Sequence, residues 1–116
     1  MATSTLPLNK FRLIGNKLNS GDNTIYQESL EVATIILSCQ ISNMTGTTQY
    51  VTVKIEKIDA VGNPFTLVKD APIPPNEALN PFTGKIVLEK NDKLIFTTAN
   101  TGTLESVLSV LENAIN

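Results

Sequence analysis

Residues 73–82 (IPPNEALNPF), 84–100 (GKIVLEKNDKLIFTTAN) and 103–112 (TLESVLSVLE) form a run of turns and alternating apolar and polar residues. Alternation with a period of two is typical of strands that have one face in a core and the other in solvent. The charges collect at turns, and Glu89–Asp92 is predicted to close a hairpin between strands at 85–88 and 93–98. The run therefore predicts an antiparallel, all-β domain.

Residues 32–43 give the strongest single strand signal in the first half of the chain. Regular alternation divides this segment into two faces. One face would carry Val32, Thr34, Ile36, Ser38 and Gln40, and the other Ala33, Ile35, Leu37, Cys39 and Ile41. Because the second set is wholly apolar, we predict that it faces the core. The same logic directs Val51, Val53 and Ile55 of the next strand inward.

Composition agrees with an all-β fold. Val, Ile and Thr account for 33 of the 116 residues and favour strands, while 12 Asn favour turns. The spacing of turn signals predicts one antiparallel β-sandwich, Ig-like or jelly-roll-like, of about seven or eight strands. We expect a flexible N-terminal arm over residues 1–10 and the sandwich over residues 11–116. The extended segment 69–73 contains Pro72 and is predicted to lie at a sheet edge.

The last element can be interpreted in two ways. Leu104, Val107, Leu108, Leu111 and Ile115 have helical spacing. The same stretch also alternates as a strand would, with Leu104, Ser106, Leu108 and Val110 against Glu105, Val107, Ser109 and Leu111. The strands and turns that precede this segment favour a strand.

The sequence shows no recognisable catalytic constellation. The chain has no histidine, which excludes Ser-His-Asp and Cys-His systems and a typical zinc site. Cys39 is the sole cysteine and is predicted to be a small buried hydrophobe. Two Asx-rich turns, Asn19–Asn23 and Asn91-Asp92, offer oxygens to calcium but lack the ligand spacing of an EF-hand. We predict no enzyme activity, no cofactor and no metal site.

Charge excludes further classes of partner. The net charge is −2 and the nine basic residues are scattered, so we expect no binding to nucleic acid or to an anionic membrane. The opening MATSTLPLNK lacks the charged and apolar regions of a secretory signal. The lone cysteine fits synthesis in a reducing cytoplasm.

Polar strand faces with few charges suggest a surface that packs against other proteins. Hydroxyls and amides can be satisfied across an interface, whereas ions often cannot. An extended arm can also add a strand to an exposed sheet edge. The predicted interface residues are Leu6, Pro7 and Leu8 of the arm, Thr34, Ser38 and Gln40 of one strand face, and Pro74, Pro75 and Phe82 of the loop at 72–82.

The order of segments over residues 24–112 resembles small virion structural proteins of tailed bacteriophages. The resemblance is carried by Ile25-Tyr26, ATIILSCQISN (33–43), GTTQYVTV (46–53), LVKDAPIP (67–74), LEKNDKL (88–94) and LESVLSVLE (104–112). That family usually has Gly where this chain has Asn91, and Asn also tolerates a positive φ. The resemblance implies a β-sandwich module of the virion and transfers no catalytic residue.

The resemblance implies a non-enzymatic virion protein made in the host cytoplasm. The first expectation is a capsid decoration or cement protein that binds the major capsid protein or neighbouring virion proteins and forms homo-oligomers. The alternative is a neck or tail component that forms a ring. A receptor- or carbohydrate-binding module is the alternative of another class, with Tyr26, Tyr50 and Phe82 as its candidate stacking platforms.

Overall fold

The computed structural model describes residues 8–27 and 32–114. Within these ranges one short 3-10 helix, η1 (Ile58–Ala60), accompanies nine strands. The strands are β1 (Leu8–Lys17), β2 (Gly21–Gln27), β3 (Val32–Asn43), β4 (Gln49–Glu56), β5 (Phe65–Ile73), β6 (Ala78–Leu79), β7 (Ile86–Leu88), β8 (Lys93–Thr98) and β9 (Leu104–Ala114). No helix among these residues is long and apolar enough to cross a bilayer.

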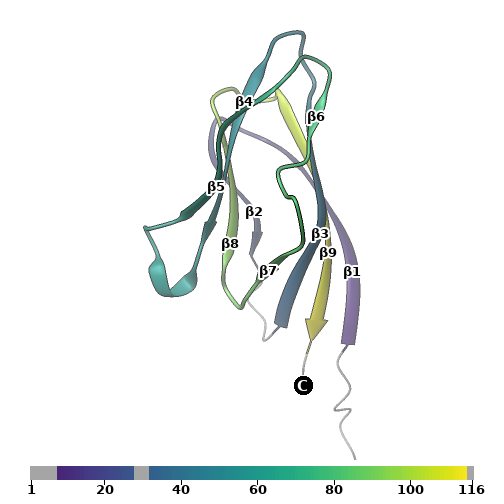
Figure 1. Cartoon of the computed structure of the whole chain (residues 1–116), viewed down its shortest axis with the longest axis vertical. Coiled ribbons are helices and arrows are strands. Elements are labelled where there is room, and N and C mark those ends of the chain that lie inside the picture. Colours follow the sequence, from purple (N-terminus) through teal and green to yellow (C-terminus); the bar gives the residue numbers. More distant parts are fainter. Residues whose placement is uncertain (1–7, 28–31, 115–116) are drawn as a thin grey trace, which may run out of the picture.

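The strands form two antiparallel sheets packed as a sandwich (Figure 1), which confirms the predicted fold class. Sheet A has the order β1-β9-β3-β6, and β7 also pairs with β3. Sheet B has the order β2-β8-β4-β5. If β6 and β7 are taken as one interrupted strand, the eight strands have the order of a jelly roll, in which every connection except the hairpin between β4 and β5 crosses from one sheet to the other.

The first strand includes the last residues of the segment that was predicted to be a flexible N-terminal arm. β1 begins at Leu8, so residues 8–10 belong to sheet A, whereas residues 1–7 lie outside the described residues. Leu8 pairs with Ala114 of β9, which places the two ends of the described chain side by side. The final element is a strand, as the context favoured, and it buries Leu104, Ser106, Leu108 and Val110 on one face.

The predicted faces of β3 are wrong for its first half. Ile36 pairs with Val110 of β9 and Ser38 pairs with the next residue, Ser109. Leu37 is therefore an extra residue that forms a β-bulge. Thr34 and Ile36 therefore point into the core before the bulge, and Cys39 and Ile41 do so after it. Regular alternation wrongly placed Ala33, Ile35 and Leu37 inside, because a bulge shifts the side-chain phase by one residue.

The predicted hairpin at Glu89–Asp92 is also wrong, since this turn crosses between the sheets. β7 pairs with β3 in sheet A, whereas β8 pairs with β2 and β4 in sheet B. Alternation and a tight turn look the same in sequence whether the chain returns along its own sheet or enters the facing one. Asn91 in this turn has a positive φ of 66°, a conformation that Asn tolerates better than most residues.

The core between the sheets is mainly aliphatic, as the scarcity of aromatic residues requires. Phe96 of β8 is its largest fully buried side chain and packs among residues from both sheets. Its fully buried aliphatic neighbours are Leu18, Ile36, Ile41, Val51, Val53, Ile73, Leu88, Leu94, Leu104, Leu108 and Val110. Val51 and Val53 are inward as predicted, and Ile55 packs against the same cluster.

The bulge can be tested with two adjacent residues of the same type. Ile36→Ala should lower the free energy of unfolding by about 3 kcal/mol because it empties a core position. Ile35→Ala should cost less than about 1 kcal/mol because Ile35 lies on the outer face. Urea unfolding of the dilute protein measures both. A larger loss for Ile35→Ala would restore regular alternation and contradict the bulge.

Candidate functional site

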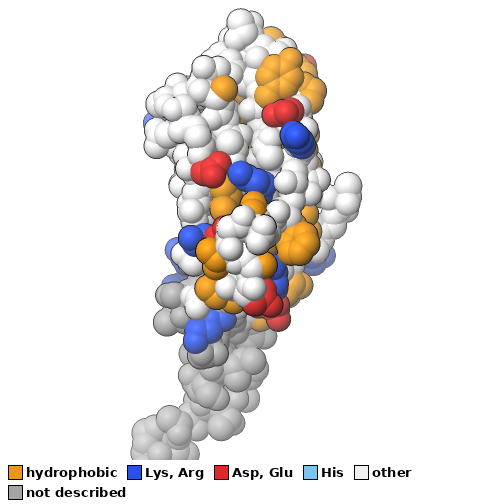
Figure 2. Space-filling view, turned by 90° about the vertical axis from the view of Figure 1, so that its left-hand side faces the viewer, with side chains coloured by type: hydrophobic (Ala, Val, Ile, Leu, Met, Phe, Trp, Pro, Cys, Tyr) orange, Lys and Arg blue, Asp and Glu red, His pale blue; other side chains and the backbone are white. Residues whose placement is uncertain are grey.

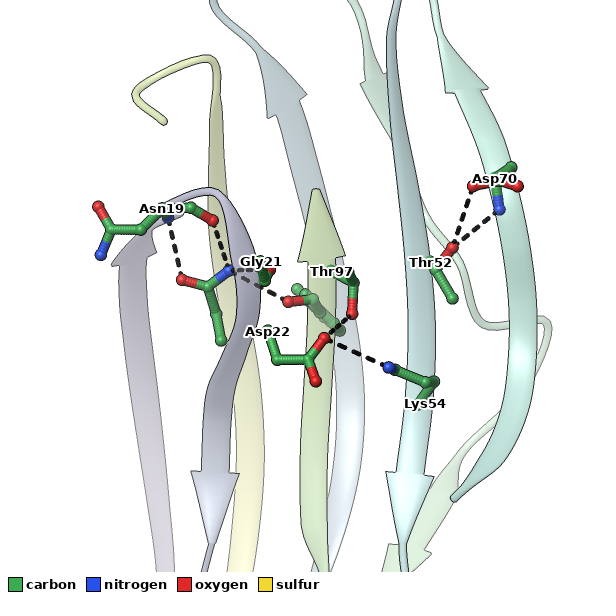
Figure 3. A network of polar contacts seen from close by, with 9 residues as sticks. Asn19, Gly21, Asp22, Thr52, Lys54, Asp70 and Thr97 are labelled. Carbon is green, nitrogen blue, oxygen red and sulfur yellow. Dashed lines mark hydrogen bonds and ion pairs between the residues drawn. The ribbon is translucent and has the colours of Figure 1, made fainter. Parts of the chain in front are cut away.

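The outer face of sheet B is polar and satisfies itself with hydrogen bonds between strands (Figure 3). Asp22 of β2 accepts a hydrogen bond from Thr97 Oγ1 of β8 at 2.6 Å and faces Lys54 Nζ of β4 at 3.3 Å. Farther along, Thr52 Oγ1 accepts a hydrogen bond from the backbone amide of Asp70 at 3.0 Å. The Thr97 hydroxyl and the Lys54 ammonium lower the pKa of Asp22.

The first calcium candidate is an Asx turn held by its own hydrogen bonds. Asn23 Oδ1 accepts the backbone amide of Asn19 at 2.9 Å, and Asn23 Nδ2 donates to the carbonyls of Asn19, Gly21 and Phe96. The Asp22 carboxylate lies near Lys54 Nζ and takes no part in the Asn23 hydrogen bonds. Within residues 8–27 and 32–114, no group of three or more Cys, Asp or Glu could hold a metal ion.

The second calcium candidate, Asp92, joins the sheet-crossing turn to the hairpin between β4 and β5. Its carboxylate is 1% exposed and accepts backbone amides from Glu89 at 3.0 Å and Ile58 at 3.2 Å, with Lys57 Nζ at 2.9 Å. Burial alone would raise the pKa of Asp92, but these donors outweigh it and hold the pKa below its ordinary value. Glu89 and Asp92 in turn raise the pKa of Lys57.

A second polar cluster lies inside the sandwich, near the paired ends of β1 and β9. Arg12 Nη1 of β1 and Glu112 Oε2 of β9 form an ion pair at 3.0 Å. The Tyr26 hydroxyl donates to the same carboxylate and lies 3.0 Å from Thr34 Oγ1. The cluster connects β2 of sheet B to β1, β3 and β9 of sheet A, and it therefore stabilises the sandwich.

The outer face of sheet A, by contrast, is apolar. The strand register places Phe11, Leu111, Ile35 and Val87 in one row across β1, β9, β3 and β7. Phe11 and Leu13 are 73% and 72% exposed, values that are unusual for large apolar side chains on one strand. We call the following set the apolar face: Phe11, Leu13, Ile35, Leu37, Val87, Val107 and Leu111.

Two hollows flank the bulge on this side of the molecule. One, of about 340 Å³, is lined by Phe11, Arg12, Leu13, Leu37, Ser109 and Val110. The other, of about 360 Å³, is lined by Ser38, Cys39, Gln40, Ala78, Leu79, Asn80 and Val107. The second hollow lies where β3 pairs with neither β6 nor β7, since β6 reaches only Ile41 and Ser42 and β7 only residues 34–36.

The structure separates the predicted interface residues. Thr34 was expected on the same exposed face as Ser38 and Gln40, but it is fully buried on the inner face because the bulge reverses the phase between them. Ser38 and Gln40 are exposed and line the second hollow. Their role in an interface remains a prediction.

The other predicted interface residues lie elsewhere. Leu6 and Pro7 are outside the described residues, and Leu8 opens β1. Pro74 is exposed and Pro75 half-buried in the turn after β5, where Asn43 Nδ2 donates to the carbonyls of Ile73 and Pro74. Phe82 is half-buried and packs against the core.

The aromatic platforms proposed for a sugar are poorly placed. Tyr26 is buried and its hydroxyl is used inside the sandwich, while Phe82 packs against the core. Tyr50 remains exposed, on β4. Cys39 is buried as predicted, and burial raises its pKa to about 12, which keeps the thiol protonated and unreactive.

Sequence reasoning missed the apolar face. The alternation Phe11-Arg12-Leu13-Ile14 was visible, but it does not say which of its two sides faces the core. The structure directs Arg12 and Ile14 inward, with Arg12 paired to Glu112, and leaves Phe11 and Leu13 outside.

Comparison with known proteins gives likenesses in structure only. Neither protein-family models nor curated proteins match the chain. A chain of the Bacillus endospore appendages, which form disulfide-linked pili, aligns over 100% of this chain and 97% of its own, with a TM-score of 0.58 and 10% identity.

Two further solved structures are similar. The Drosophila NLP core, studied for pentamer formation and histone binding, aligns over 87% of this chain and 96% of its own, with a TM-score of 0.51 and 11% identity. A chain of the T13 IBDV viral particle aligns over 92% of this chain and 31% of its own, with a TM-score of 0.54 and 10% identity. At such identities these likenesses establish the fold.

Asp92→Ala should lower the free energy of unfolding by about 3 kcal/mol, because it leaves the amides of Glu89 and Ile58 without their acceptor and removes one of the two carboxylates that face Lys57. Glu89→Ala is the matched control, and loss of this exposed ion-pair partner should cost less than about 1 kcal/mol. Urea unfolding at neutral pH measures both. Equal losses would show that Asp92 is an ordinary surface carboxylate.

The contribution of Asp92 should also depend on pH. Because the folded pKa lies below the ordinary value of 3.8, the contribution is complete above that value and is lost as the pH falls through the folded pKa. The stability difference between wild type and Asp92→Ala should therefore shrink between about pH 5 and about pH 2. A difference that stays constant over this range would exclude the ionised carboxylate as its source.

Proposed function

We propose that this protein is a non-enzymatic structural subunit that functions by packing against other subunits of an assembly. The observation that carries the proposal is the apolar face of sheet A. Phe11 and Leu13 of β1 and Val87 of β7 are exposed on this face, and the strand register links them through Leu111 and Ile35. The outer face of sheet B instead carries polar contacts between its strands. Contiguous exposed apolar surface is the usual mark of an interface.

The fold and the absence of paired catalytic groups support the same proposal. The similar solved proteins come from a pilus, a viral particle and a pentamer-forming core. Several carboxylates with neighbouring donors, among them Asp22, Asp92 and Glu112, are engaged in contacts that hold strands or turns together. These structural contacts explain the positions of the carboxylates, so no catalytic role is needed to explain them.

In its finer form, the proposal is a virion protein of a tailed phage that decorates and stabilises the capsid. The resemblance of residues 24–112 to small virion proteins supports this form. Many copies on a regular lattice would each add a modest apolar contact, and multivalency turns such contacts into a stable coat. A ring at the neck or tail would use the same surface in another symmetry.

Phe11→Ser tests the proposal because it removes an exposed apolar side chain at little cost to the fold. We expect the variant to weaken assembly by at least about tenfold, as for a central interface residue. Light scattering over a concentration range, alone and with empty capsids of the phage that encodes the protein, gives the native mass and the bound fraction.

Tyr50→Ser is the matched control, since Tyr50 is 54% exposed on β4 of the opposite sheet. It should leave assembly and capsid binding unchanged. A wild-type protein that stays monomeric and ignores capsids, or a control that fails as badly as Phe11→Ser, would contradict the proposal.

A further inference from the structure

We propose that the apolar face receives the hairpin between β4 and β5 of a second copy of this chain, so that copies join head to tail. This inference rests on the proposed function, because it names the partner of the same face. The part of the hairpin that would dock is its tip, defined by Ile58, Val61 and Phe65.

The hairpin tip is the second place where large apolar side chains gather in solvent. Val61 and Phe65 are 66% and 62% exposed, and Ile58 is also exposed. Figure 1 shows the hairpin projecting from the side of sheet B, away from β1, β3 and β9. Figure 2 looks onto this side and shows hydrophobic side chains gathered around the projecting hairpin.

The tip is held in one shape before it meets a partner. The amide of Ala60 donates to the carbonyl of Lys57, and the amide of Asn63 donates to that of Ala60, both at 3.0 Å. Glu56 accepts the amide of Gly62, and Asp92 accepts the amide of Ile58. A preorganised tip loses little conformational entropy on docking, which favours binding.

The two apolar surfaces lie on opposite sides of one molecule, and this decides the symmetry. A patch that meets itself gives a closed pair, whereas a patch that meets a different patch leaves one of each free. The tip of one copy on the face of the next would therefore give a ring or a filament. The hollow beside Phe11, Leu13 and Leu37, about 340 Å³, offers a seat for an apolar side chain.

Charge fits the tip as the occupant of the apolar face. Lys17 is exposed on β1, on the same side of the strand as Phe11 and Leu13, and Asp59 is exposed at the tip. Neither residue has an ion-pair partner among the described residues. Tip-to-face docking brings the Asp59 carboxylate towards the Lys17 ammonium.

Mixing two defective variants tests this arrangement. Leu13→Asp disables the face and Val61→Asp disables the tip, and each alone should be monomeric at concentrations where the wild type assembles. An equimolar mixture should form a dimer and nothing larger, because the intact tip of the first variant meets the intact face of the second. Light scattering gives the masses, and far-UV circular dichroism verifies that each variant is folded.

Other outcomes would overturn the inference in distinguishable ways. If Val61→Asp assembles like the wild type, the tip is not the partner. If the mixture stays monomeric, the two surfaces do not meet. If the wild type is monomeric but binds capsids through Leu13, the inference fails while the proposed function stands. Thr24→Asp, on β2 of sheet B, is the control and should assemble normally.

Charge reversal gives an independent readout that does not depend on apolar contacts. Asp59→Lys should weaken assembly by about tenfold. Combining it with Lys17→Glu should recover at least part of that loss. No recovery would show that these charges do not face each other across the contact.

Discussion

The structure depends on the pairing of β9 with a strand on each side. β9 pairs with β1 over ten residues without a break, and the irregularity in the pairing of β9 with β3 lies in β3. β3 has one extra residue there, Leu37, which reverses its side-chain phase. As a result, Ile36 and Cys39 both reach the core, and Ile35 and Leu37 are left on the outer side.

The bulge contributes to the difference between the two outer faces. Sheet B joins its strands outside with a carboxylate, hydroxyls and a lysine, although Tyr50 and Leu67 are also exposed there. Sheet A has apolar side chains outside, since the bulge turns Ile35 and Leu37 to the same side as the exposed Phe11 and Leu13 of β1. Burying these apolar side chains would release water from their surface.

Much of the fold could be predicted from the sequence, because alternation and turn residues are local signals. The all-β class, the terminal strand and the edge position of the Pro72 segment follow from such signals. Which side chains of β3 face the core could not be predicted, because this depends on which β3 residue has no partner in β9. The sheet assignment of β7 and β8 likewise depends on distant strands, and so does the exposure of Phe11 and Leu13.

Thiol labelling of Val107→Cys tests most directly whether the apolar face is covered in the assembled state. Val107 lies on that face and is close to cysteine in size, while native Cys39 is buried with a pKa of about 12 and stays unreactive. The account predicts that alkylation slows at least about tenfold when the protein is concentrated enough to assemble, and that Thr24→Cys on sheet B reacts at an unchanged rate. An equal rate for Val107→Cys in the dilute and the assembled protein would contradict it.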